Sequence, residues 1–134
     1  GSFTVEPDKG YYITHQTGTT QRYVTVVGKL FLGKNRPINL YQGSNMVGTV
    51  FPVKIPLNDA NLKPVLTPGT VMSCDTVMTY DYTIPNWVKA YLILDANNLP
   101  QFTGTVTDFE PGKGYFINNQ SAPINPDIWN YPIP

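Results

Sequence analysis

Apolar and polar residues alternate with a period of two along much of this chain, whereas the period of an amphipathic helix does not recur. The alternating segments are residues 21–32, 45–55, 70–82, 87–94 and 101–109. β-Branched and aromatic residues dominate them, which favours a pleated, half-buried strand over a helix. We therefore interpret all five segments as β-strands.

Turn-forming residues separate these segments so frequently that they predict antiparallel hairpins. Clusters of Gly, Pro, Asn, Asp and Thr lie near residue 18 and at 33–37, 41–45, 67–69, 81–86 and 95–100. The predicted fold class is all-β: a single antiparallel β-sandwich or partly open β-barrel over residues 1–134, with one or two short helical turns. We expect proline, which cannot donate to a strand ladder, to blunt the sheet edges.

The two helical turns are predicted from capping residues. Within residues 56–64, Asn58 or Asp59 could cap a turn, and within 125–131 Asn125 occupies an N-cap position with Pro126 at the first helical position. Neither turn is expected to exceed about two turns of helix.

One segment of twelve residues occurs twice, as VEPDKGYYITHQ at 5–16 and FEPGKGYFINNQ at 109–120, with seven identical positions. In the second copy Pro111 fixes φ at the first corner of a turn, and Gly112 tolerates the left-handed conformation, as Asp8 does in the first copy. We interpret Gly114, the equivalent of Gly10, as a position that needs positive φ or a close backbone approach. A strand follows whose Tyr and Ile are expected to face opposite sides, with the preceding lysine on the solvent side of the turn.

The two copies, within residues 3–16 and 109–120, are separated by nearly the whole chain. We interpret this spacing as one period of a tandem array of modules, which is usually architectural. Two equivalent hairpins related by a pseudo-twofold axis within one barrel remain the alternative. Gly1 and Ser2 are typical of the scar that cloning leaves, so they are excluded from the fold argument.

Composition excludes several classes of function. Nine basic residues balance nine acidic ones, and charged residues make up only 13 % of the chain, below the roughly 25 % typical of soluble domains. No basic stripe is present, so nucleic acid is not an expected partner. No apolar run approaches the roughly 18 residues of a membrane span. The single cysteine, Cys74, precludes a disulfide within the chain and is interpreted as a small buried residue.

Candidate catalytic and metal-binding residues are sparse, and we predict neither an enzyme nor a cofactor. His15 is the only histidine, and the only glutamates, Glu6 and Glu110, occupy equivalent positions in the repeated segment, where hydrogen bonding at a turn explains them. Oxygen-rich segments at 74–82 and 95–98 lack the spacing of a calcium loop, so no metal site is predicted.

Aromatic residues give the one candidate binding site. Tyr80, Tyr82 and Trp87 cluster around the turn at 81–86, and an exposed aromatic ring offers an apolar face and a polar tip to a sugar. Trp129 and Tyr131 form a second group. Tyr82 and Trp87 rings that pack inward would indicate core residues, whereas rings that lie coplanar and exposed would favour carbohydrate binding.

The segments GYYITHQTGTTQRYVTVVGKL (10–30) and NLYQGSNMVGTVFPVKIPLNDANL (39–62), closed by FEPGKGYFINN (109–119), carry a resemblance. They are similar to β-rich repeat modules of large, mostly uncharacterised bacterial secreted proteins. The resemblance implies an extracellular or cell-surface location and no assigned chemistry. We therefore expect a non-catalytic structural or adhesion module of a larger secreted or cell-surface protein, whose partners are neighbouring modules or other surface proteins. The alternative is a carbohydrate-binding module that uses exposed aromatics.

Overall fold

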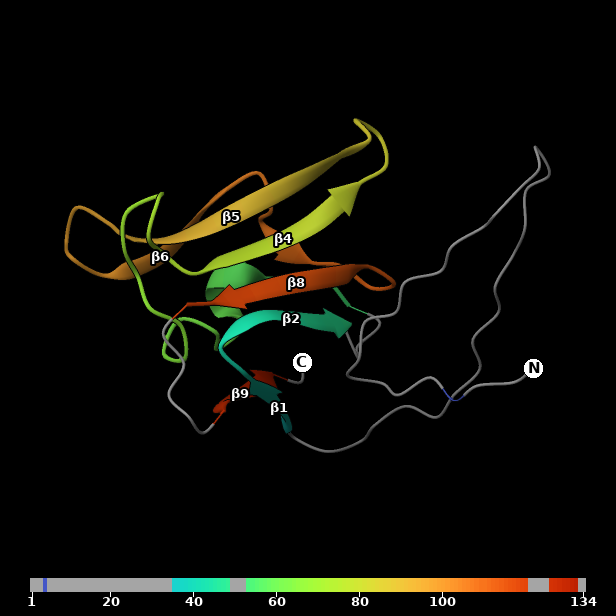
Figure 1. Ribbon diagram of the computed structural model, residues 1–134, viewed down its shortest axis with the longest axis horizontal. Helices are drawn as coiled ribbons and strands as arrows, with labels where there is room; N and C mark the ends of the chain where they lie inside the picture. The colour runs from blue at the N-terminus through green and yellow to red at the C-terminus, as the bar shows by residue number, and fades with distance from the viewer. Residues whose placement is uncertain (1–3, 5–34, 49–52, 121–125, 133–134) are drawn as a thin grey trace.

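The computed structural model describes residue 4 and residues 35–48, 53–120 and 126–132 (Figure 1). These residues form β1 (Asn35–Leu40), β2 (Gly43–Gly48), β3 (Ile55–Pro56), a 3-10 turn η1 (Leu57–Asp59), β4 (Thr76–Asp81), β5 (Asn86–Leu94), β6 (Pro100–Gly104), β7 (Asp108–Phe109), β8 (Gly114–Asn119) and β9 (Asp127–Pro132). The all-β prediction is confirmed.

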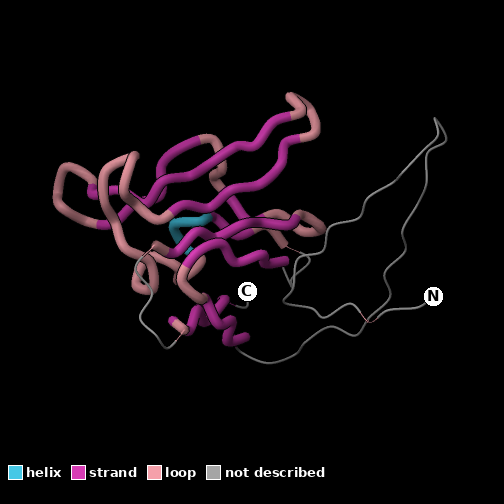
Figure 2. Tube along the Cα trace, viewed as in Figure 1, coloured by secondary structure: helices cyan, strands magenta, loops and turns pink. Residues whose placement is uncertain are grey.

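The strands form three antiparallel sheets that do not close into a barrel. The largest has the order β2-β8-β4-β5-β6, and two ribbons, β1-β9 and β3-β7, accompany it. Figure 1 shows the β1-β9 ribbon beyond the β2 edge of the large sheet, and Figure 2 shows the helical turn η1 among the strands. Within the described residues, no helix is long and apolar enough to cross a bilayer.

The two ribbons and η1 pack against one face of the five-stranded sheet, which we call the inner face. Alternate residues of its central strands are buried there, and the ribbons contribute Phe109, Trp129 and Tyr131 to the same core. The ring centroid of Phe109 lies 4.8 Å from that of Tyr115 on β8 and 5.3 Å from that of Trp129 on β9. Because strand side chains alternate, the other set of residues lies on the opposite, outer face.

The prediction of a helical turn at 125–131 is wrong, because this segment contains β9. Trp129 and Tyr131 are two residues apart and both are buried, as the period of a strand requires, and β9 pairs with β1 through Ile38↔Trp129. Asn125 lies outside the described residues.

The helical turn predicted within 56–64 is present as η1, but its predicted caps are wrong. Pro56 occupies the N-cap position and no side chain caps the turn. The Asn58 amide instead bonds the main chain of Phe102 on β6: its Oδ1 accepts from the Phe102 N–H at 2.9 Å, and its Nδ2 donates to the Phe102 oxygen at 3.3 Å. The edge of β6 is therefore covered by an amide as well as by Pro100.

Strand boundaries differ from the predicted segments in four places. Residues 70–75 form turns rather than strand, because the amides of Ser73 and Cys74 both donate to the Thr70 oxygen. The segment 45–55 contributes β2 and β3, the segment 101–109 contributes β6 and β7, and β1 begins inside the turn predicted at 33–37. The segment 21–32 lies outside the described residues. Cys74 is buried, as interpreted.

The second copy of the repeated segment has the predicted turn, with one correction. Gly112 has φ +77°, and the Lys113 N–H donates to the Glu110 oxygen at 3.3 Å, which is the pattern of a type II turn. Gly114 is not the constrained glycine: its φ is not positive and a Cβ built on it meets no atom within 4 Å. The first copy, with Gly10, lies outside the described residues, so the choice between a tandem array and an internal pseudo-twofold stays a prediction.

The expectation that Tyr and Ile face opposite sides of the strand is also wrong. Tyr115 and Ile117 are both buried on the inner face, while Phe116 between them lies on the outer face. Residues two apart in a strand share a face, so the repeated segment delivers one buried tyrosine and one outward aromatic ring.

Candidate functional site

Tyr80, Tyr82 and Trp87 come together on the outer face, at the end of the β4-β5 hairpin. Tyr80 and Trp87 are directly opposite in the β4-β5 register, with ring centroids 5.4 Å apart at 78°. The Tyr82 ring lies 4.9 Å from Tyr80 at 69°. Edge-to-face contact is a favourable geometry for aromatic pairs. Because of it, neither Tyr82 nor Trp87 is coplanar with Tyr80.

The rings are accessible to a ligand. Tyr82 is 85 % exposed and Trp87 is 39 % exposed, which are high values for aromatic side chains. Of the two alternatives that the sequence left, the exposure of Tyr82 and Trp87 excludes inward packing. The expected coplanar platform is not formed with Tyr80, because both rings are steeply inclined to it. Inward packing holds instead for Trp129 and Tyr131, which are both buried in the core.

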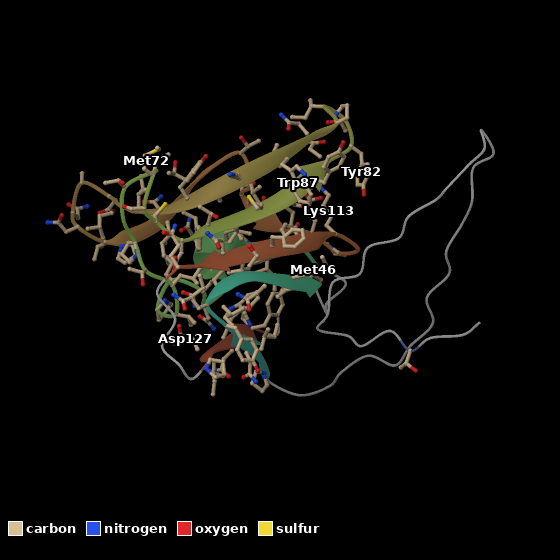
Figure 3. All side chains as sticks on the ribbon, viewed as in Figure 1. Met46, Met72, Tyr82, Trp87, Lys113 and Asp127 are labelled. Atoms are coloured by element: carbon tan, nitrogen blue, oxygen red, sulfur yellow. The ribbon has the colours of Figure 1, made fainter. Side chains whose placement is uncertain are left out.

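A groove of about 440 Å³ opens beside these rings. It is lined by Met46, Thr79, Tyr80, Tyr82, Trp87, Gly112, Lys113, Gly114, Tyr115 and Phe116. We call it the aromatic groove. Its volume is within the range of roughly 300–1,000 Å³ typical of small-molecule sites. In Figure 3, Tyr82, Trp87, Lys113 and Met46 gather toward one end of the large sheet, far from Met72 and Asp127.

Long-range strand pairing supplies the rest of the groove. Phe116 on β8 pairs with both Met46 on β2 and Met78 on β4, and its ring centroid lies 5.5 Å from that of Trp87. The next residue of β8 on the outer face is Gly114, two residues from Phe116, and it pairs with Gly48 on β2. Neither glycine has a side chain, so the apolar side chains do not continue here. The groove therefore exists where two adjacent strands both carry glycine.

The hairpin turn that presents Tyr82 is fixed by Asp81. One oxygen of its carboxylate accepts from the Thr83 N–H at 2.8 Å and from the Thr83 hydroxyl at 2.7 Å. These hydrogen bonds lower the pKa of Asp81 below its ordinary value. The ionised side chain thus serves the turn, an arrangement common for Asp at such positions.

The cation beside the groove is paired. Lys113 Nζ lies 2.8 Å from Glu110 Oε2 across the type II turn. The Thr79 hydroxyl donates to the Gly114 oxygen at 2.8 Å, which ties β4 to β8 at the groove. The groove is thus lined mainly by apolar and aromatic groups, and the positive charge of Lys113 is balanced by Glu110.

A second ion pair links β7 to the residue before β3. Lys54 Nζ is 3.0 Å from Asp108 Oδ2, and the hydrogen bond between them raises the pKa of Lys54. Partial burial opposes ionisation of Asp108, but hydrogen bonds from Thr107 and Lys54 outweigh it and lower the pKa of Asp108. Both shifts keep these groups charged. Within the described ranges, no three His, Cys, Asp or Glu side chains converge as metal ligands.

Sequence reasoning found three residues of the groove and missed the other seven, among them Met46, Gly114 and Phe116. The three it found are close in the chain around one turn. Phe116 had a usable signal, since it alternates with the apolar Tyr115 and Ile117 in the repeated segment. His15 and Glu6 lie outside the described residues.

Comparison of the chain with protein-family models, with curated proteins and with solved structures gave no match. The aromatic groove is therefore interpreted from its own geometry.

Proposed function

We propose that this chain is a non-catalytic adhesion module of a larger secreted or cell-surface protein, and that it adheres by binding carbohydrate in the aromatic groove. The observation that carries the proposal is the exposure of Trp87 and Tyr82 next to a groove of ligand size. Exposed large aromatics that cluster around a cavity mark interaction sites more often than chance placement does.

The chemistry of the lining supports a sugar as the ligand. A pyranose ring has apolar C–H faces and a rim of hydroxyl groups, so it can stack on an indole or phenol ring while its hydroxyls bond polar tips. Tyr80, Tyr82 and Trp87 supply both kinds of contact, because each combines an aromatic body with an O–H or N–H group. Rings inclined at 69° and 78° to Tyr80 would enclose a ligand from two sides rather than present a flat platform.

Retention on insoluble polysaccharides tests this function. We expect the protein to be retained on at least one of cellulose, chitin, mannan and starch, and Tyr82→Ala and Trp87→Ala to lose retention while remaining folded by circular dichroism. Tyr41→Ala is the matched control, since Tyr41 is 57 % exposed but does not line the groove. Equal retention of all variants, or no retention of the parent protein on these polymers or on the acidic polymers polygalacturonate and alginate, rejects carbohydrate binding at this site.

A purely architectural role is the second candidate, and one observation favours it. Met46, Phe116 and Met78 form a register row across β2, β8 and β4 on the outer face, which extends the apolar surface beyond the aromatic rings. Such a surface suits contact with a neighbouring module. If this role holds, Met78→Lys abolishes association between linked modules in sedimentation experiments and polysaccharide retention is absent.

A further inference from the structure

One of the residues that line the aromatic groove, Gly114, is a glycine that the backbone conformation does not require. Gly114 does not have positive φ, and a Cβ at this position would meet no atom within 4 Å. Gly114 is the first residue of β8, and glycine is unfavourable in a strand because it loses more backbone freedom on folding and offers no side chain to pack. Neither turn geometry nor close packing therefore explains the absence of a side chain here.

The direction of the missing side chain is defined by the strand. Gly114 and Phe116 are two residues apart on β8, so a side chain at 114 would project from the outer face beside the ring of Phe116. Gly114 lines the groove together with Tyr80 and Trp87. The hydrogen bond from the Thr79 hydroxyl to the carbonyl oxygen of Gly114 fixes the main chain at this residue. Any side chain at 114 would thus enter the space enclosed by the aromatic rings.

Charge limits the chemistry of the ligand. Among the described residues, Lys113 is the one Lys, Arg, Asp or Glu residue that lines the groove, and Glu110 pairs with it at 2.8 Å. An anionic ligand would have to compete with Glu110 for this ammonium group, and a cationic ligand would find no carboxylate in the described lining. The remaining groups are aromatic, aliphatic, hydroxyl and main-chain groups, which suit an uncharged ligand.

We infer that Gly114 forms the floor of a subsite for one ring of an uncharged saccharide, and that the absence of a side chain at 114 determines what the groove admits. This inference rests on the proposed carbohydrate binding and adds to it a ligand class and a specificity-determining residue. The ring lies over the main chain of Gly114, in the place where a strand side chain would otherwise project, and contacts Trp87 and Tyr80 at its sides.

Substitution of the glycine separates this inference from the broader function. Gly114→Val fills the subsite with a residue of high strand propensity, so the melting temperature is expected to stay equal or rise. Affinity for the neutral polysaccharide that retains the parent protein is expected to fall at least about tenfold, because the valine side chain occupies the space that the sugar ring needs. Gly114→Ala, with one carbon that meets no atom within 4 Å, folds as the parent protein does and loses less affinity.

The control places the same residue, valine, on the same face outside the groove. Ser44 lies on β2 opposite Asn118, does not line the groove and is exposed, so Ser44→Val is expected to leave affinity unchanged. The probes are cellulose, chitin, mannan and starch as neutral polymers, with polygalacturonate and alginate as acidic ones.

The outcomes distinguish the two proposals. Loss of binding in Trp87→Ala with full binding in Gly114→Val overturns the floor subsite and leaves carbohydrate binding intact. Retention on the acidic polymers alone, weakened by Lys113→Gln, overturns the uncharged class. Retention of the parent protein on none of the six polymers rejects the proposed function, and the subsite with it.

Discussion

The hydroxyl group of Tyr115 accepts a hydrogen bond of 2.7 Å from the main-chain N–H of Glu110. The same hydroxyl donates to the main-chain oxygen of Asp108 at 3.1 Å. One buried side chain on β8 thus holds the strand β7 and the start of the type II turn in place. The turn carries Gly112 and Lys113 to the groove, so the buried and exposed rings of the repeated segment have complementary roles.

Tyr115→Phe should destabilise the domain without affecting the packing of its ring. It leaves the Glu110 N–H and the Asp108 oxygen without the hydroxyl, and loss of such partners costs about 1–3 kcal/mol. Urea unfolding measures the change. The control Tyr82→Phe removes an exposed hydroxyl and should lower the free energy of unfolding by less than about 0.5 kcal/mol. Equal effects of the two substitutions would contradict the role assigned to the Tyr115 hydroxyl.

The free energy of unfolding should decline in alkaline solution, because two buried tyrosines ionise at a higher pH in the folded protein than in the unfolded chain. Burial raises the pKa of both Tyr115 and Tyr131 to about 12. Below about pH 10, the ordinary tyrosine pKa, both groups are protonated in the folded and unfolded states and their contribution is constant. Above it the unfolded chain loses these protons first, so the free energy of unfolding falls as pH rises towards 12.

Urea midpoints measured from about pH 8 to about pH 11 test this expectation. The Lys54–Asp108 pair also loses its contribution as pH rises, because the pKa of Lys54 is raised in the folded protein. The test is therefore the difference in pH dependence between variants and the parent protein. Tyr131→Phe should show a shallower decline than the parent protein, and Tyr82→Phe the same decline. Parallel curves for Tyr131→Phe and the parent protein would count against a raised pKa at Tyr131.

Asp75 and Asp95 each accept two main-chain hydrogen bonds, but in different surroundings. The buried carboxylate of Asp75 accepts from the main-chain N–H groups of Thr67 and Gln120, each at 2.8 Å. Asp95 accepts from Asn97 and Leu99 at 2.8 and 2.9 Å in an exposed hairpin turn.

Asp75→Ala should therefore cost about 3 kcal/mol or more, because it removes a buried carboxylate that accepts two main-chain hydrogen bonds, and water replaces a buried acceptor less readily. In Asp95→Ala, water replaces the lost acceptor, and the expected cost is about 1 kcal/mol. The two are compared by urea unfolding. A cost for Asp95→Ala equal to that for Asp75→Ala would show that burial does not set the strength of these bonds.

Asn58 should keep β6 from pairing with another chain. Its side-chain amide bonds both polar main-chain groups of Phe102 on the last strand of the large sheet. Asn58→Ala exposes those groups, and an edge strand with unpaired N–H and C=O groups is a template for aggregation. Static light scattering during mild heating should show earlier aggregation than for the parent protein. Asn130→Ala, on the exposed side of β9, should behave as the parent protein does.

Local patterns predicted the parts of the fold in which neighbours in sequence are neighbours in space. The segment 87–94 matches β5 almost residue for residue, because Ala90 and Leu92 alternate with outward residues. The aromatic cluster was predictable for the same reason, since Tyr80 and Trp87 flank one short turn. By contrast, Asn-Pro before Asp127 satisfies the rules for a helix start, and only the pairing of Trp129 with Ile38 on β1 decides for a strand.

The groove itself depends on contacts that no local pattern contains. Met46 and Phe116 are separated by most of the domain and meet through the β2-β8 register, while Gly114 comes beside Tyr80 through β8-β4 pairing. A glycine after a turn resembles a turn residue in the sequence, which is why the local pattern predicts a backbone role for Gly114. Only the sheet order of the described residues shows that it lines the groove.

The chain contains two tryptophans, and their fluorescence tests binding in the groove most directly. Trp87 is 39 % exposed in the groove, whereas Trp129 is 1 % exposed in the core with its indole N–H bonded to the Ala60 oxygen at 2.6 Å. Acrylamide should quench Trp87 far more than Trp129. Addition of a soluble oligomer of the neutral polysaccharide that retains the protein should protect Trp87 and blue-shift its emission, with no response in Trp87→Phe. Quenching of Trp87 that is unchanged at a saccharide concentration sufficient for retention would contradict binding in the aromatic groove.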